Sequence, residues 1–142
     1  MTNNEYNIFV DTNILIGAYS ENKTFQDEKK CWKYLTNLEG RNIYVSSLSI
    51  AQFIALFQKR KYSDAIIRRN VRNILTKANV ISFSKSDIET SLLNTYKDME
   101  DSIQLTLAKK MKCAVIVTQN KKDYNFMDID IVTTKTYRSI KQ

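Results

Sequence analysis

The stretch NIFVDTN, residues 7–13, decides how the rest of the chain is interpreted. Its first four residues form a short, mainly apolar run, which is typical of a buried β-strand, and three polar residues follow directly. Ligands of open α/β sheets bind beyond the carboxyl ends of the strands. Asp11 is therefore the first candidate for a functional side chain. The alternative is that it only caps the helix that follows it.

Short apolar runs and longer amphipathic stretches alternate along the whole sequence. We expect strands at 7–10, 43–46, 80–83, 114–118 and 129–132. We expect helices at 24–39 with Gly40 as C-cap, from 46–49 onward, at 63–78, 84–94 and 98–111, and a short basic helix at the end of the chain. Because parallel strands can be joined only by long crossovers, the alternation predicts a parallel sheet. The expected fold is a three-layer α/β/α arrangement around a doubly wound sheet of about five strands.

Length and composition indicate one domain over residues 1–142. The chain is 43% hydrophobic and 26% charged, with no proline and two glycines, which is ordinary for a globular protein without linkers. Its first residues lack the build of a secretory signal, and no apolar run reaches the roughly 18 residues of a membrane span. Two distant cysteines do not require an oxidising compartment. We therefore expect a cytoplasmic protein with no membrane partner.

The chain contains no histidine, which excludes Ser-His-Asp and Cys-His catalysis and any zinc site built on imidazole. Proton transfer must then involve carboxylates, lysine, tyrosine or metal-bound water. The net charge of +7 and the isoelectric point of about 9.4 favour a polyanionic partner. The alternative is that the excess charge only keeps the protein soluble.

Basic residues are concentrated between residues 56 and 79, where seven of them accompany a single acid. Arg68 and Arg72 are four residues apart and would share one helix face, with Arg69 beside them. A solvated helix more often mixes charges of both signs, so these arginines are candidates for binding the phosphates of RNA. The alternative is an ordinary solvated face.

Acidic residues gather where a metal site would need them. In the helix at 98–111, Glu100 and Asp101 fall on the apolar arc and are expected to point towards the protein, while Asp98 lies at its boundary. The helix dipole explains acids in a first turn but not their inward direction. Asp123 follows the strand at 114–118, although an ordinary turn would also explain it.

Several carboxylates at one sheet edge suit a hard, oxygen-preferring ion such as Mg²⁺ or Mn²⁺. A bound cation is also the natural partner of buried carboxylates that have no nearby Lys or Arg. Such an ion can polarise a phosphodiester oxygen and lower the pKa of bound water, and this chemistry needs no histidine.

Several stretches together resemble PIN domains. IFVDTNIL at 8–15 resembles their opening signature, and VSSLSIA at 45–51 resembles their second strand and following helix. DMEDSIQ at 98–104 and IVTQNKKDY at 116–124 resemble the branch with the pattern D-F-E-D-A-L-Q followed by V-T-R-N-x-K-D-F. The match covers essentially the whole chain in order and spacing. Many PIN domains are endoribonucleases, including VapC-type toxins held in check by a partner antitoxin.

The resemblance implies a metal-dependent ribonuclease with an acidic pocket for Mg²⁺ or Mn²⁺. By position, Asp11, Asp101 and Asp123 are the expected catalytic and metal-binding carboxylates. Asp98 and Glu100 are further metal-site acids. The expected supporting polar residues are Thr12, Asn13, Gln52, Thr118 and Asn120. The expected partners are RNA, an antitoxin protein and a second copy of the chain.

One position departs from the usual PIN pattern. The helix after the second strand typically carries Glu where this chain has Gln52, which keeps an oxygen but loses the charge. Asp98 and Glu100 are placed to restore it. The alternative function is a degenerate domain that binds RNA or a protein without cutting. A receiver-like signalling domain is a poorer match, because Asp11 stands alone and residues 133–135 do not supply the expected Lys context.

Overall fold

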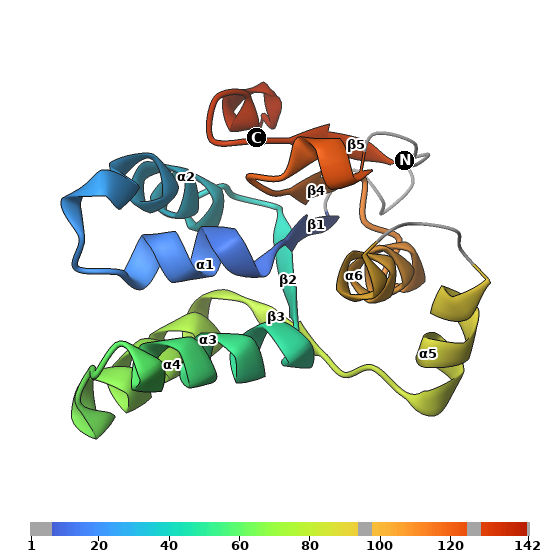
Figure 1. Ribbon diagram of the computed structural model, residues 1–142. Helices are drawn as coiled ribbons and strands as arrows, with labels where there is room; N and C mark the ends of the chain where they lie inside the picture. The colour runs from blue at the N-terminus through green and yellow to red at the C-terminus, as the bar shows by residue number, and fades with distance from the viewer. Residues whose placement is uncertain (1–6, 94–97, 125–128, 142) are drawn as a thin grey trace.

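The computed structural model describes residues 7–93, 98–124 and 129–141, without the side chain of Asp123. Within these residues, parallel strands form one sheet in the order β3-β2-β1-β4-β5 (Figure 1). The strands are β1 (Asn7–Val10), β2 (Asn42–Ser46), β3 (Asn79–Ile81), β4 (Val115–Val117) and β5 (Asp130–Val132). The predicted parallel sheet is confirmed.

Helices connect the strands and cover both faces of the sheet (Figure 1). The α-helices are α1 (Thr12–Tyr19), α2 (Gln26–Thr36), α3 (Ser47–Lys59), α4 (Asp64–Lys77), α5 (Lys85–Leu92) and α6 (Met99–Lys110). Short 3₁₀ helices lie at η2 (Lys23–Phe25), η3 (Lys121–Tyr124) and η4 (Tyr137–Ser139). Helices α1 to α4 lie on one face, and α5 and α6 lie on the other. The three-layer prediction is therefore also confirmed.

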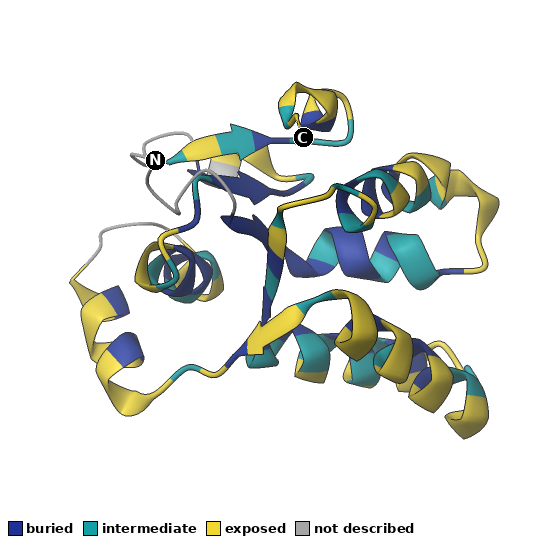
Figure 2. Cartoon of the chain, turned by 180° about the vertical axis from the view of Figure 1, so that it is seen from behind, coloured by how far each residue is buried: buried dark blue, intermediate teal, exposed yellow. Residues whose placement is uncertain are grey.

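Strand β1 is buried on both faces, because consecutive side chains of a strand point in opposite directions. Ile8 and Val10 pack into the larger core cluster, which also contains residues of α1 to α4. Phe9 packs into the second cluster with residues of α6 and with Tyr124. Figure 2 shows β1 and β4 buried, whereas the edge strand β3 is largely exposed.

The predicted helix at 24–39 is shorter than expected. It consists of η2 and α2 and ends at Thr36 rather than at Gly40. Asn37 is its C-cap, and the Asn37 amide donates to the carbonyl oxygen of Lys33 at 2.7 Å. This side chain satisfies a carbonyl that another helical turn would otherwise use. Gly40 instead has a positive φ of 71° in the turn before β2.

Other boundaries shift by one or two residues. Strand β3 starts at Asn79 rather than Val80, and the closing basic helix is only the 3₁₀ turn η4. Asn94, the expected end of the short helix at 84–94, lies outside the described residues. No helix in the described part of the chain is both long and apolar enough to cross a bilayer.

Candidate active site

The carboxyl ends of β1 and β4 place two polar residues side by side. Val10 is in register with Val117, so Asp11 and Thr118 leave the sheet as neighbours. The Asp11 backbone N–H donates to the Val117 carbonyl oxygen at 2.9 Å, which extends the strand pairing by one step. The Thr118 hydroxyl then donates to Asp11 Oδ2 at 2.8 Å.

Asp11 is both the N-cap of α1 and the centre of a buried polar network. Its side chain is 5% exposed, and Oδ1 accepts from the Thr12 backbone N–H at 2.8 Å. Asp11 therefore does cap α1, as the structural alternative predicted, but capping does not account for its other contacts. Oδ1 also accepts from the Gln104 amide at 3.3 Å, and Oδ2 lies 3.5 Å from the Asn13 amide. Donors from α1, α6 and the end of β4 thus fix one carboxylate.

Burial raises the pKa of the Asp11 carboxyl above its usual value. Hydrogen bonds from Thr118, the Thr12 backbone and Gln104 favour the charged form, but they only partly offset this cost. A positive charge beside the carboxylate would lower that cost further. The electrostatics of this position therefore favour a cation.

Helix α6 brings a second carboxylate to the same place. Asp98 is its N-cap and accepts from the backbone N–H groups of Glu100 and Asp101 at 2.9 and 3.2 Å. Asp101, one helical turn further, accepts from the Tyr124 hydroxyl at 3.1 Å. The same hydroxyl lies 3.3 Å from Asp11 Oδ2. Tyr124 therefore joins two carboxylates that are 90 residues apart in sequence.

A chain of polar side chains runs from β2 to α6. Ser46 donates to Ser49 at 3.1 Å, and Ser49 lies 2.7 Å from the Thr12 hydroxyl. Thr12 donates to Gln52 Oε1 at 2.8 Å, and Gln52 Nε2 donates to Glu100 Oε2 at 2.6 Å. The hydroxyls of this chain can all donate in the direction of Gln52, so Gln52 Oε1 accepts while Gln52 Nε2 donates to Glu100. The amide of Gln52 therefore holds the Glu100 carboxylate at the pocket.

Glu100 differs from its sequence-based expectation. The helical wheel predicts that Glu100 and Asp101 both point into the protein, but Glu100 is exposed and Asp101 is half-buried. Glu100 lies in the first turn of α6, at the open edge of the core. A wheel gives the direction of a side chain and not its depth.

These residues line one pocket of about 350 Å³. Its lining combines carboxylates and amides with two apolar side chains, and among the described residues it includes no lysine or arginine. The lining residues are Asp11, Thr12, Asn13, Ile16, Gln52, Leu56, Asp98, Glu100, Asp101, Gln104 and Asn120. Thr118 lies directly behind them, because its hydroxyl bonds Asp11 and accepts from the Asn120 backbone N–H at 3.1 Å.

The oxygen atoms that line the pocket are suited to bind a hard cation. The lining carboxylates and amide oxygens are the ligands that Mg²⁺ and Mn²⁺ prefer. No three acidic or thiol side chains of the described residues are arranged closely enough to hold an ion together. The side chain of Asp123, the third expected ligand, lies outside the described part of the chain. Among the described residues, Asp11 and Asp101 share the Tyr124 hydroxyl, and Asp98 and Glu100 line the same pocket.

Sequence reasoning missed two residues of this network. Gln104 is 2% exposed and donates to Ser49 at 2.8 Å as well as to Asp11, while its Oε1 has no partner among the described residues. Tyr124 is fully buried. A glutamine three residues after Asp101 on a buried helix face was the available signal for Gln104. Its orphaned oxygen is a further polar atom at the pocket wall.

The three arginines lie apart from the pocket, on the exposed surface of α4. Arg68 bonds Asp64 at 2.6 Å within that helix, so part of its charge is balanced locally. Arg68 and Arg72 border a groove of about 280 Å³ between α3 and α4. The expected basic face therefore exists, with one internal ion pair.

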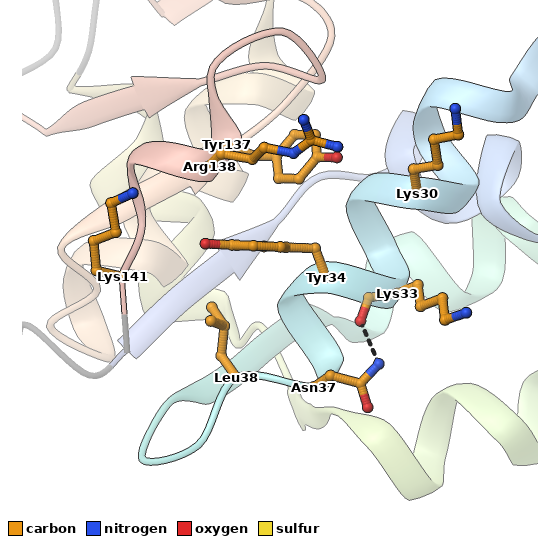
Figure 3. A pocket seen from close by; sticks show the side chains of 8 residues that line it. All are labelled: Lys30, Lys33, Tyr34, Asn37, Leu38, Tyr137, Arg138 and Lys141. Carbon is orange, nitrogen blue, oxygen red and sulfur yellow. Dashed lines mark hydrogen bonds between the residues drawn. The ribbon is translucent and has the colours of Figure 1, made fainter.

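A separate cavity of about 640 Å³ lies between α2 and the C-terminal segment (Figure 3). Lys30 and Lys33 come from α2, and Arg138 and Lys141 come from the end of the chain. Tyr34 forms its floor, where it bonds the Ile140 carbonyl oxygen at 2.7 Å. In Figure 3, Lys30 and Lys33 lie on one side of the Tyr34 ring and Lys141 lies on the other. No acid lines this cavity among the described residues.

Known proteins resemble the chain in both sequence and fold. A family model described as a PIN domain matches residues 7–122. Ribonuclease VapC1 of Aquifex aeolicus is 23% identical over 139 residues, which cover 94% of each chain. A toxin-antitoxin complex from Klebsiella pneumoniae superposes with a TM-score of 0.68 at 22% identity, over 89% of this chain and 97% of that chain. VapBC2 from Rickettsia felis, bound to a DNA fragment from their promoter, gives 0.68 at 17% identity, over 89% and 98%.

Proposed function

Because the chain belongs to the PIN domain family, we propose that it is a metal-dependent endoribonuclease that hydrolyses RNA phosphodiester bonds. The observation that carries this proposal is the convergence of Asp11 and Asp101 on one hydroxyl inside an acidic pocket. The similarity to Ribonuclease VapC1 supports the same reaction. PIN nucleases use divalent ions, and we assign Mg²⁺ or Mn²⁺ to this pocket because its donors are oxygens.

In this proposal, Asp11, Asp101 and Asp123 hold the ion, with Asp98 and Glu100 adding negative charge around it. A divalent ion bound there would polarise the phosphodiester and lower the pKa of the attacking water. The chain's own network prepares the carboxylates for that role. Thr118, Asn13 and Gln104 fix Asp11, and Gln52 orients Glu100.

We assign RNA binding to the basic face of Arg68, Arg69 and Arg72. Arg68 and Arg72 of α4 border the groove between α3 and α4, and α3 also carries the pocket-lining residues Gln52 and Leu56. A phosphate backbone that follows α3 would pass from these arginines to the acidic pocket. The net charge of +7 favours its approach.

The toxin-antitoxin complexes among the similar structures motivate a partner proposal. The chain would act as the toxin of a toxin-antitoxin pair in the cytoplasm, with an antitoxin protein and a second copy of itself as partners. RNA remains the substrate in this arrangement.

One observation favours a second candidate, a binding module that does not cut. Gln52 replaces the usual Glu, and its amide is already engaged with Thr12 and Glu100. Such a domain would retain RNA on the basic face without hydrolysis.

A cleavage assay on mixed RNA separates the two candidates. Purified protein is incubated with Mg²⁺, with Mn²⁺ or with excess chelator, and RNA binding is measured in parallel by filter retention. We expect cleavage with either ion and none with chelator. Retention of RNA with no cleavage under any condition would favour the binding module.

A further inference from the structure

Tyr124 occupies a place that the proposed chemistry has not used. Its ring is fully buried in the second core cluster, among Phe9, Leu105 and Ile116. Its hydroxyl leaves that core between the carboxylates of Asp101 and Asp11, at 3.1 and 3.3 Å. Because the ring cannot shift without disturbing the core, the oxygen is a fixed point of the pocket wall.

The hydroxyl of Tyr124 is not needed for the packing of its ring, because a Phe ring would fill the same core. A phenol carries one proton, while two carboxylates lie within its reach. Packing therefore accounts for the ring of Tyr124 but not for its oxygen.

We propose that Tyr124 is a positioning residue that holds the carboxylates of Asp11 and Asp101 together to receive a divalent cation. This inference rests on the proposed function. Without a donor between them, two carboxylates in one pocket repel each other and separate. A shared hydroxyl reduces that repulsion and leaves both groups near the position that an ion requires.

The hydroxyl and an ion can bind the same carboxylates at once. An ionised carboxylate offers about four lone-pair sites on its two oxygens, so accepting from Tyr124 does not occupy it fully. Outer hydrogen bonds of this kind orient metal ligands, and their removal typically costs about 10–100-fold in metal affinity. The opposite possibility is that the phenol proton competes with the ion, in which case its removal would tighten binding.

The test is to titrate metal-free protein with Mn²⁺ in the absence of RNA and to measure binding by calorimetry. We compare the wild type with Tyr124→Phe, which keeps the ring and removes the oxygen. The dissociation constant should rise about 10-fold or more. The matched control is Tyr34→Phe, which also removes a hydroxyl that donates a hydrogen bond, to the Ile140 carbonyl oxygen far from the pocket. The control should bind Mn²⁺ as the wild type does.

A double-mutant cycle separates positioning from general stability. If Tyr124 acts through Asp101, Tyr124→Phe should change Mn²⁺ affinity much less in an Asp101→Asn background. Equal effects in both backgrounds would overturn the proposal, as would unchanged or tighter binding by Tyr124→Phe. Loss of folding in Tyr124→Phe, seen by circular dichroism, would make the hydroxyl structural and also overturn it. Wild-type protein that binds no Mn²⁺ would instead refute the metal site of the proposed function.

Discussion

The acidic pocket and the basic cavity are both hollows lined by charges of one sign, but they are built differently. Asp11 is buried and receives donors from several elements. In the basic cavity, Lys30 and Lys33 are exposed side chains whose charged ends diverge (Figure 3). The pocket has about half the volume of the cavity, at 350 against 640 Å³.

The difference shows that organisation distinguishes a candidate catalytic site better than size or charge. Desolvating Asp11 costs free energy, which its hydrogen bonds only partly recover. Solvated lysines incur no such cost and can be arranged in many ways. Changes in the pocket should therefore affect both stability and ion binding, whereas changes in the cavity should affect neither.

The largest effect on stability is expected from Thr118→Val. The substitution keeps the shape of a fully buried side chain but removes the hydroxyl that donates to Asp11 at 2.8 Å. We expect the free energy of unfolding to fall by about 1–3 kcal/mol in metal-free protein, because a buried carboxylate loses a donor. Lys33→Gln in the basic cavity should stay within about 0.5 kcal/mol of the wild type. Urea denaturation measures both, and equal stability of the two variants would erase the distinction between the regions.

A smaller effect is expected from Gln52→Glu. The new carboxylate would face Glu100, to which the Gln52 amide now donates at 2.6 Å. Repulsion between the two carboxylates should lower the melting temperature of metal-free protein. The decrease should be only a few degrees, because Glu100 is exposed and water screens the charges. Saturating Mn²⁺ should then raise the melting temperature of the variant more than that of the wild type.

The control for this prediction is Gln58→Glu, the same change at an exposed position of the same helix. Its melting temperature should respond to Mn²⁺ as the wild type does. An identical response of Gln52→Glu and Gln58→Glu would mean that position 52 does not contribute to the ion site.

The smallest effect on the fold is expected from replacing Arg68, Arg69 and Arg72 together with Gln. RNA binding should weaken. In a plot of the logarithm of the binding constant against the logarithm of the salt concentration, each lost phosphate contact should make the slope shallower by about 0.7. A charge-matched variant of the basic cavity, with Lys30, Lys33 and Arg138 changed to Gln, tests the other surface. If only that variant flattens the slope, RNA follows the cavity and not α4.

Much of the fold could be predicted because the central strands β1 and β4 are buried on both faces and helices separate most of the strands. The alternation of apolar runs therefore indicates strand number and parallel pairing directly. The end of α2 could not be predicted from Gly40, because the local side-chain bond of Asn37 competes with the helix. Such competition depends on rotamers that composition does not reveal.

The site was only partly accessible to sequence reasoning. Asp11 and Asp101 could be proposed from their places after a strand and on a helix face. Tyr124 and Gln104 could not, because their roles arise from contacts with Asp11 across 113 and 93 residues. Periodicity shows which way a side chain points within its element but not what another element brings to meet it.

The rate of RNA cleavage by Asp11→Asn and Asp101→Asn in saturating Mn²⁺ shows whether the acidic pocket performs metal-dependent cleavage. Each amide keeps the shape but loses the charge that binds the ion, so the initial rate should fall by about 100-fold or more. Loss of a group that only hydrogen-bonds a metal ligand already costs about 10–100-fold. Asp130→Asn, at an exposed acid on β5, should cleave like the wild type. Circular dichroism must show all three variants folded. Wild-type cleavage rates in Asp11→Asn or Asp101→Asn would mean that the acidic pocket is not the site of cleavage.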